Sequence, residues 1–325
     1  MMRAPCRWPP ALVVPMLVAA CLFVYSLARF QASNPYIDPI FDQRQDVTIP
    51  SIIHQSWKNE TLPKRFQKWS DSWKRHHPTW TYILWTDDMN RKLIETSFPW
   101  FLDTYDALPK NINRADASRY FYMYKYGGVY ADLDMECLRA MDAPVVEGGP
   151  ALIERGSALI SFMGLDTQFE HSLPNAWMAS APGHPFWMFV VDEIMRAVAR
   201  STTLTAEEAT GPVVLYKAWM RFRSFPTAKR SGLTVLKHGY IYPYNWNYKN
   251  SAEAFIYPDN WLDVKYLYSI CSAQSDQIDE ELCKKKLGAE GKPGQLAYTI
   301  TYWSHVWEPA KSNKQVLDQK AAHAR

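Results

Sequence analysis

The stretch "YKYGGVYADLDMECLR", residues 124–139, runs from a helix-like aromatic segment through a glycine pair and a short strand into a group of acids. Gly127 and Gly128 stop the helical pattern, and residues 129–131 have the apolar composition of a buried strand. Charged side chains are costly at the end of a buried strand unless something pairs with them. The stretch therefore indicates a functional site as well as a fold.

The acids are Asp132, Asp134 and Glu136, each two positions from the next. On the turn after a strand, Asp132 and Asp134 can point into one cleft. Two converging carboxylates cannot both stay charged and unpaired in a partly buried place. Mg²⁺ or Mn²⁺ resolves this, because such an ion takes one or two carboxylates and fills its other positions with waters and substrate phosphates. We expect a cation at Asp132 and Asp134, Glu136 facing solvent or behind the site, and a glycine pair that lets the backbone approach a bulky ligand.

A second charged pair lies on the preceding helix pattern, "NINRADASRYFYMYKYGG", residues 111–128. Asp116 and Arg119 are three apart and share one helix face, which brings them to the same end of the sheet as the acids. An exposed pair at this spacing is worth only about 0.2–0.5 kcal/mol. The rest of the helix is aromatic and apolar, however, which favours a buried pair. There the aspartate can accept from sugar hydroxyls and the arginine can bind phosphate or sugar oxygens.

Strand and helix patterns alternate from residue 47 onward. This alternation predicts a mostly parallel sheet with helices on both faces, in which ligands bind beyond the carboxyl ends of the strands. The strand candidates are residues 49–57, 80–85 and 129–132, and two more apolar segments lie at 151–154 and 157–163. Helix patterns cover residues 62–77, a segment capped by Thr86, residues 111–126 and 184–200, and a segment beginning near Pro212.

Composition sets the broad class. The 325 residues are 47% hydrophobic and 14% aromatic, enough to bury a substantial core. A net charge of +3, without a basic stripe carrying interleaved aromatics, argues against a nucleic-acid partner. Cys271 and Cys283 lie in a polar segment that allows a short-loop disulfide, and Cys137 is then left as a small buried side chain.

The N-terminal segment reads differently from the rest. Residues 9–28 are almost uncharged, close to the roughly 20 residues that a bilayer-spanning helix needs. Arg3 and Arg7 precede this run and predict a cytosolic N-terminus. We expect an uncleaved signal anchor, with a cleaved signal peptide as the alternative, and either places residues 35 onward in the secretory lumen. The expected division is a stub and transmembrane helix at 1–29, a stem at 30–46, a catalytic domain at 47–308 and a polar tail at 309–325.

Three segments carry a family resemblance. "IPSIIHQSWK" (49–58), "ADASRYFYMYKYGGVYADLDM" (115–135) and "NAWMASAPGHPF" (175–186) resemble glycosyltransferase family 32, whose members contain the DXD sugar-binding region. That family includes fungal outer-chain-initiating mannosyltransferases and inositol phosphoceramide mannosyltransferases. The resemblance spans roughly residues 47–220. It implies a GT-A-like fold, an α/β nucleotide-binding domain whose DXD motif holds a metal on the donor diphosphate.

The resemblance also implies catalytic and metal-binding roles. Asp132 and Asp134 would serve Mn²⁺ or Mg²⁺ and the donor phosphates, with Asp134 the more direct ligand. Asp116 and Arg119 would hold the donor sugar and phosphate. Related enzymes often use a histidine near the C-terminus as a metal or diphosphate contact, and His305 stands in that place. The glycine-serine-tryptophan element that usually follows this histidine is absent here.

Donor-binding roles follow for four further residues. Trp57 would stack near the nucleotide base, with His54 and Gln55 beside it at the end of the first strand. Asn175 would face the transferred sugar. Residue type alone supports other interpretations: Trp57 can equally be a core residue, and a histidine within an apolar strand is more often satisfied in the core than bound to a ligand.

The implied activity is metal-dependent transfer of a hexose with retention, from a nucleotide sugar to a hydroxyl acceptor that is a glycan, a lipid or a small molecule. GDP-mannose is the favoured donor and a UDP-hexose the second. The expected location is the Golgi or endoplasmic reticulum membrane, as a single-pass type II protein with a lumenal catalytic domain. One alternative is a UDP-hexose-dependent transferase acting on a lipid or small metabolite. Another is an inactive lumenal carbohydrate-binding protein.

A metal-dependent phosphatase that uses Asp-x-Asp is a further alternative. It is disfavoured because Glu136 stands where those enzymes prefer threonine or valine. Both aspartates of the motif, together with Asp116 and Arg119, are intact, which argues against an inactive protein.

Overall fold

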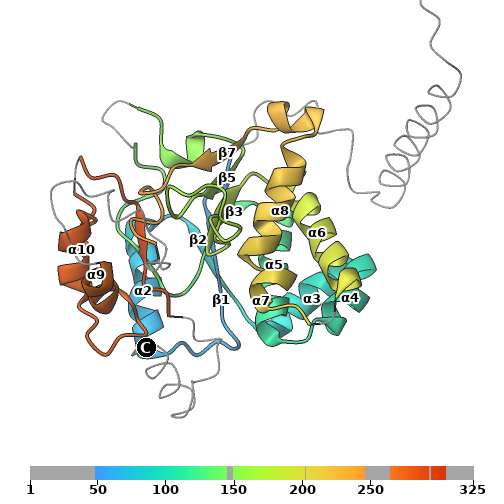
Figure 1. The fold of residues 1–325 in the computed structure, drawn as a ribbon, viewed down its shortest axis with the longest axis horizontal. Coiled ribbons are helices and arrows are strands. Elements are labelled where there is room, and N and C mark those ends of the chain that lie inside the picture. The colour runs from blue at the N-terminus through green and yellow to red at the C-terminus, as the bar shows by residue number, and fades with distance from the viewer. Residues whose placement is uncertain (1–47, 145–148, 202, 246–263, 293, 305–325) are drawn as a thin grey trace, which may run out of the picture. The chain divides into compact units, whose positions relative to one another are not determined.

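Two β-sheets form the framework of the unit that begins at Asp46 (Figure 1). The computed structural model describes residues 48–144, 149–201, 203–245, 264–292 and 294–304. The larger sheet has the strand order β2-β1-β3-β6-β5-β7, and the smaller one pairs β4 with β8. The strands are β1 (Ile52–Ser56), β2 (Thr81–Trp85), β3 (Gly128–Ala131), β4 (Met135–Cys137), β5 (Ala158–Ser161), β6 (Trp177–Ser180), β7 (Leu233–Leu236) and β8 (Thr299–Thr301).

Most strands of the larger sheet run in the same direction. β1 pairs in parallel with both β2 and β3, and β5 pairs in parallel with β7. β6 lies antiparallel between β3 and β5. The prediction of a mostly parallel sheet is therefore confirmed, with one reversed strand in the middle. Parallel pairing brings the carboxyl ends of β1 and β3 to the same edge.

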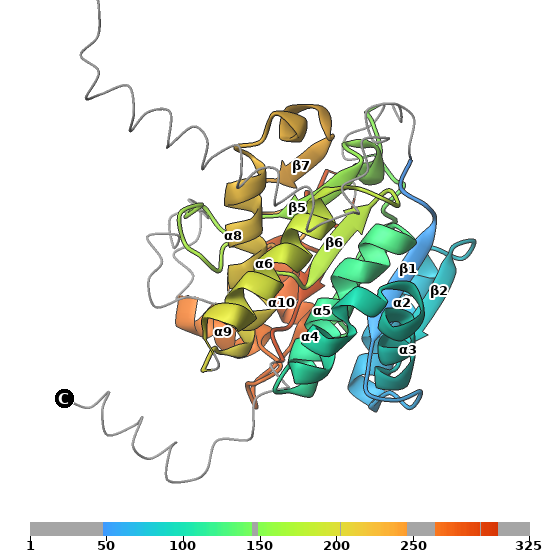
Figure 2. The same ribbon diagram turned by 90° about the vertical axis from the view of Figure 1, so that its right-hand side faces the viewer.

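Helices cover both faces of this sheet, as Figures 1 and 2 show. In Figure 1, α2 lies on one side of the strands and α3, α5, α6 and α8 lie on the other. Thr86 caps α3 as expected, because its hydroxyl accepts a hydrogen bond from the backbone N–H of Met89 at 3.2 Å. The helices are α2 (Lys64–His76), α3 (Asp87–Ser97), α4 (Leu102–Ala107), α5 (Asn111–Lys125), α6 (Phe186–Arg200), α7 (Ala206–Ala209), α8 (Pro212–Phe222), α9 (Val264–Cys271) and α10 (Glu280–Leu287). Short 3₁₀ turns are η2 (Pro99–Phe101), η3 (Leu152–Glu154) and η4 (Pro226–Arg230).

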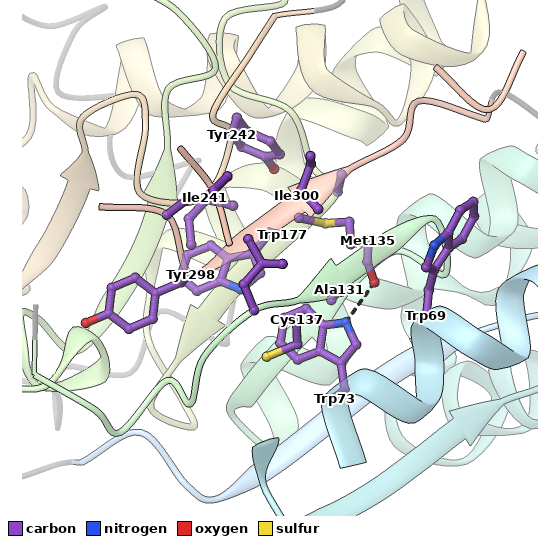
Figure 3. Close-up of a cluster of buried hydrophobic side chains, with 14 of the residues drawn as sticks. Trp69, Trp73, Ala131, Met135, Cys137, Trp177, Ile241, Tyr242, Tyr298 and Ile300 are labelled. Atoms are coloured by element: carbon purple, nitrogen blue, oxygen red, sulfur yellow. Dashed lines mark hydrogen bonds between the residues drawn. The ribbon is translucent and has the colours of Figure 1, made fainter. Parts of the chain in front are cut away.

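An aromatic core lies between α2 and the two sheets (Figure 3). Trp69 and Trp73 on α2 are fully buried, and each contributes on the order of 2–3 kcal/mol by burial. The Trp73 indole N–H donates to the backbone oxygen of Met135 at 2.9 Å. This hydrogen bond connects α2 to β4. Because β4 directly follows the acidic turn, the contact also helps to hold that turn in place.

Gly127 and Gly128 serve chain packing. Both have positive φ, +66° and +90°. A Cβ at Gly128 would lie 2.6 Å from the backbone oxygen of Ile52, and one at Gly127 would lie 2.5 Å from that of Ser180. The space that a side chain would occupy at these two glycines is taken by the backbone of β1 and β6. The expectation that the glycine pair lets the backbone approach a bulky ligand was therefore wrong.

The cysteine prediction is confirmed. Cys271 and Cys283 form a disulfide that joins α9 to α10, and Cys137 is a buried free thiol.

Glu136 was expected to face solvent or to lie behind the site, and the solvent-facing expectation was wrong. It is buried, and its carboxylate accepts from Lys284 Nζ at 3.1 Å and from the Tyr302 hydroxyl at 2.5 Å. A buried carboxylate of this kind needs such partners. The pair links β4 to α10 and β8 and belongs to the scaffold.

Several expectations concern segments outside the described residues. These are the predicted transmembrane helix at 9–28, the stem, the polar tail and His305. Among the residues that the structure describes, no helix has the length and apolar character needed to cross a bilayer.

Candidate active site

A cavity of about 490 Å³ opens at the carboxyl ends of β1 and β3. Trp57 enters it directly after β1, and Asp132 and Asp134 enter it directly after β3. α5 adds Asp116 and Arg119. The sequence prediction that the charged helix pair and the acidic turn meet at one sheet edge is confirmed in this respect.

Arg119 lies at the centre of the charged group and is 4% exposed. Its guanidinium forms ion pairs with Asp116 at 2.8 Å and with Asp132 at 3.1 Å. It also donates to the backbone oxygen of Asn175 at 2.9 Å and lies over the Tyr130 ring, 4.6 Å from its centroid. One planar cation thus fixes two carboxylates and the loop before β6, which a flexible ammonium could not do.

Asp116 is held from both sides. Asn175 Nδ2 donates to its Oδ1 at 3.1 Å, and Thr210 Oγ1 donates to its Oδ2 at 3.3 Å. Burial raises the pKa of Asp116, while Arg119 and these two hydrogen bonds act in the opposite direction. The carboxylate therefore has a single orientation on the cavity wall, suited to accepting from a ligand hydroxyl.

Asp132 is anchored through both its backbone and its side chain. Its N–H donates to Ala176 O at 2.8 Å, and its Oδ1 accepts from the Tyr130 hydroxyl at 2.6 Å. Burial raises the pKa of Asp132 to about 7, although Arg119 lowers it. A third of the side chain stays exposed (32%), so solvent still reaches the carboxylate and moderates the cost of its charge.

Asp134 is held by the C-terminal part of the chain. Its Oδ2 accepts from the Ser304 backbone N–H at 2.7 Å and from the Ser304 hydroxyl at 2.8 Å. Its backbone oxygen accepts from Tyr302 N–H at 2.9 Å. Two donors on one carboxylate oxygen fix the orientation of the other oxygen.

The two acids fit a divalent cation that is shared with a ligand. Within the part of the chain that the structure describes, Asp132 Oδ2 and Asp134 Oδ1 receive no hydrogen bond. Across those same residues, no group of three His, Cys, Asp or Glu side chains could hold a metal by itself. Mg²⁺ and Mn²⁺ are commonly bound by one or two carboxylates completed by waters and phosphates, and this donor set matches that pattern.

Trp57 and Asn175 lie where the sequence placed them, on the cavity wall. The Trp57 ring packs edge-on against Phe66 with centroids 5.1 Å apart. Its indole N–H has no hydrogen-bond partner among the described residues.

The structure does not bring His54 to the cavity. His54 is fully buried in the middle of β1: its Nε2–H donates to Gly127 O at 2.8 Å, and its Nδ1 accepts from the Trp85 indole at 3.0 Å. Burial lowers the pKa of His54 to about 4, so the ring is neutral. Both nitrogens are used, and no ligand contact is left. The interpretation of His54 as a satisfied core histidine agrees with the structure.

Gln55 is also buried, and it lies behind the acidic turn. Its Nε2 donates to the backbone oxygen of Asp132 at 3.2 Å, and its Oε1 accepts from Tyr82 at 2.9 Å. It therefore supports Asp132 from β1 and does not line the cavity.

Three contributors were missed from the sequence: Tyr130, Thr210 and Ser304. Tyr130 could have been found, because a residue two positions before Asp132 on a strand shares its face. Thr210 and Ser304 act on Asp116 and Asp134 from 94 and 170 positions away. No local pattern marks such contacts.

The comparison with protein families bears directly on this site. Residues 63–149, which include Asp116, Arg119, Asp132 and Asp134, match the model of the glycosyltransferase sugar-binding region containing the DXD motif. The chain carries a glycosyltransferase DXD domain. The resemblance to glycosyltransferase family 32 is thereby confirmed.

Several curated relatives of this segment are fungal mannosyltransferases. Inositol phosphoceramide mannosyltransferase 3 of Schizosaccharomyces pombe is 39% identical over 207 residues, which cover 63% of this chain and 54% of the relative. Mannosyltransferase 1 of the same series and organism is 28% identical over 254 residues, covering 73% of each chain. The chain thus spans about half the length of the first of these relatives. Among solved structures, the PaToxG glycosyltransferase aligns with a TM-score of 0.41 and 16% identity, over 60% of this chain and 79% of that one.

Proposed function

We propose that the protein is a metal-dependent glycosyltransferase that moves a hexose from a nucleotide sugar to a hydroxyl acceptor, with retention of configuration. One observation carries this proposal. Arg119 joins Asp116 and Asp132 on the wall of a cavity that also contains Asp134 and Trp57. The cavity thus combines hydroxyl acceptors, a cation-binding pair and an aromatic ring.

Asp132 and Asp134 would hold the divalent cation through the oxygens that receive no hydrogen bond from described residues. Mn²⁺ or Mg²⁺ in that place would neutralise negative charge on the leaving diphosphate. Arg119 adds a fixed positive charge beside the same phosphates. Asp116, held by Asn175 and Thr210, would accept from hydroxyls of the donor sugar.

Transfer then requires the acceptor oxygen to bond to the anomeric carbon while the bond from that carbon to the diphosphate breaks. The nucleoside diphosphate leaves with the electron pair, and its leaving oxygen takes the acceptor proton as the new glycosidic bond forms. Because each carboxylate is fixed before the donor binds, little reorganisation remains for the reaction. No covalent enzyme intermediate is part of this proposal.

Mannose from GDP-mannose is the proposed donor group, supported by the mannosyltransferase relatives. A glycan, a lipid or a small metabolite is the acceptor class. We place the reaction in the lumen of the Golgi or endoplasmic reticulum, since residues 9–28 have the composition of a signal anchor. A reporter fused after Arg325 should be protected from protease in sealed vesicles, and its digestion would refute this topology.

The proposed activity is tested with a panel of nucleotide sugars. The full chain is incubated with each donor, with and without Mn²⁺, and free nucleoside diphosphate is measured in the absence of acceptor. Release of GDP from GDP-mannose that needs Mn²⁺ supports the proposal. A folded protein that releases no diphosphate from any donor, and whose melting temperature does not respond to Mn²⁺ plus any nucleoside diphosphate, refutes it.

A further inference from the structure

One stretch of the cavity wall is formed by residues other than those proposed to hold the diphosphate. It consists of Trp57, Lys58, Asp87, Asn111, Ile112 and Ala115. The backbone N–H of Trp57 donates to the backbone oxygen of Trp85 at 2.9 Å. Asp87 follows Trp85 by two residues, so Trp57 and Asp87 come directly after the ends of two neighbouring strands. The α5 residues come from its first turns and lie up to eight positions, about 12 Å along the axis, before Arg119. A nucleoside can span that distance from base to diphosphate.

The wall has the chemistry of a slot for a planar ring. Trp57 offers an aromatic surface, and Ile112 and Ala115 offer small apolar ones. Stacking on such surfaces is tolerant of base identity, because every base has a π-face. Discrimination between bases must therefore come from a polar group at the ring edge.

Asp87 is such a group. It is half-buried at the first position of α3, and its side chain accepts no hydrogen bond from any residue that the structure describes. Arg114, whose charge acts on Asp87, makes its hydrogen bonds elsewhere, since its two terminal nitrogens donate to Leu108 O and to Asn111 Oδ1. Burial raises the pKa of Asp87, and Arg114 offsets this only in part. A half-buried carboxylate in a cavity without a donor is in place to accept from a ligand.

We propose that Asp87 reads the base edge of the donor nucleotide and selects guanine. This inference rests on the proposed function and adds to it the identity of the nucleotide base and the residue that selects it. A carboxylate presents acceptors only, and guanine presents two adjacent donors, its N1–H and its N2 amino group. Uracil presents a single N3–H between two carbonyl oxygens, which a carboxylate would repel. A charge-assisted pair joined by two parallel hydrogen bonds is among the stronger hydrogen-bonded contacts in proteins.

The binding experiment uses GDP, IDP and UDP as probes, each with Mn²⁺, against the full chain in calorimetry. IDP lacks only the N2 amino group, so it removes one of the two donors without changing the protein. The wild type should bind GDP about 10-fold or more tightly than IDP or UDP, the range of a bidentate contact to a base.

The variant arm uses Asp87→Asn, with Asp88→Asn as its control. Asp88 is the next acid of the same helix turn, is exposed and does not line the cavity. An amide presents one donor and one acceptor, which match O4 and N3–H of uracil. Asp87→Asn should therefore weaken GDP binding by about 10-fold or more, abolish the preference of GDP over IDP, and strengthen UDP binding. Asp88→Asn should leave all three affinities within about 2-fold of wild type, since it alters only a screened surface charge.

Equal wild-type affinities for GDP and IDP would overturn the guanine assignment, as would a UDP preference or an Asp87→Asn variant that weakens all three probes alike. In those cases metal-dependent nucleotide binding survives, and with it the proposed function. If none of the probes binds with Mn²⁺, the proposed function fails and this inference fails with it. The GDP and IDP comparison uses wild-type protein, so it holds even if the variant does not fold.

Discussion

The Arg119→Lys substitution tests the organisation of the site most directly. Two terminal nitrogens of Arg119 make three contacts, to Asp116 at 2.8 Å, to Asp132 at 3.1 Å and to Asn175 O at 2.9 Å. A lysine ammonium is a compact point charge that cannot reproduce the planar fork, so we expect it to keep one of these contacts. Each lost hydrogen bond to a charged group is worth about 1.5 kcal/mol at the low end. The expected loss is therefore about 3 kcal/mol.

Two measurements on the full chain should both show this loss. The free energy of unfolding in urea should fall by about 3 kcal/mol, because two buried charge-assisted hydrogen bonds are lost. Metal-dependent release of diphosphate from the donor should fall by about 100-fold or more, since 1.36 kcal/mol corresponds to a factor of ten in rate.

Arg91→Lys is the matched control. Arg91 also forms a forked pair, with Asp106 at 3.1 and 2.8 Å, but these side chains are 50% and 45% exposed. Such surface pairs contribute about 0–1 kcal/mol, so this variant should resemble the wild type in both assays. If Arg119→Lys is as mild as Arg91→Lys, Arg119 is not the organising group. If it unfolds more easily yet releases diphosphate normally, its role is confined to the scaffold.

Three other predictions concern the metal pair, the glycine turn and the disulfide. Asp134→Ala should abolish the Mn²⁺-dependent rise in melting temperature with nucleoside diphosphate, and a retained rise contradicts the metal assignment. The unliganded melting temperature should fall, because two hydrogen bonds from Ser304 are lost. Gly128→Ala, with φ +90° and a Cβ 2.6 Å from Ile52 O, should cost at least about 2 kcal/mol in urea unfolding. Gly288→Ala, with φ +58° and open space around the Cβ, should cost only about 1 kcal/mol, and equal costs would contradict the steric argument. Cys283→Ser should cost about 3 kcal/mol, as expected for a short closed loop; stability unchanged under non-reducing conditions would rule that out.

Local sequence patterns were sufficient for much of the fold. The helix pattern over residues 62–77, the threonine cap of α3 and the glycine stop after α5 are each contained within one segment, and each was predicted. β6 was not among the strand candidates, and its reversed direction could not be inferred either, because strand direction is decided by pairing with β3 and β5, which lie elsewhere in the chain. Its short apolar sequence is compatible with either direction.

The site shows the same division. Asp116 and Arg119 could be paired from the helix period alone, and the acids from the strand end. His54 and Gln55 carry polar groups on a strand that is buried on both faces, where the partners that satisfy them come from distant segments. Sequence position alone could not tell whether those polar groups meet a ligand or the backbone of Gly127 and Asp132.

The hydrogen bonds from Ser304 to Asp134 have a consequence for folding during synthesis. The two residues are 170 positions apart, and a ribosome adding about 5–20 residues per second needs about 10–30 seconds to travel between them. Throughout that interval the nascent polypeptide carries both acids, but β8 has not yet been made and the carboxylate of Asp134 still rotates freely. A chain halted before Thr299 would contain the whole DXD stretch but lack the strand that holds it, so Asp134 reaches its final orientation only after Ser304 has been made.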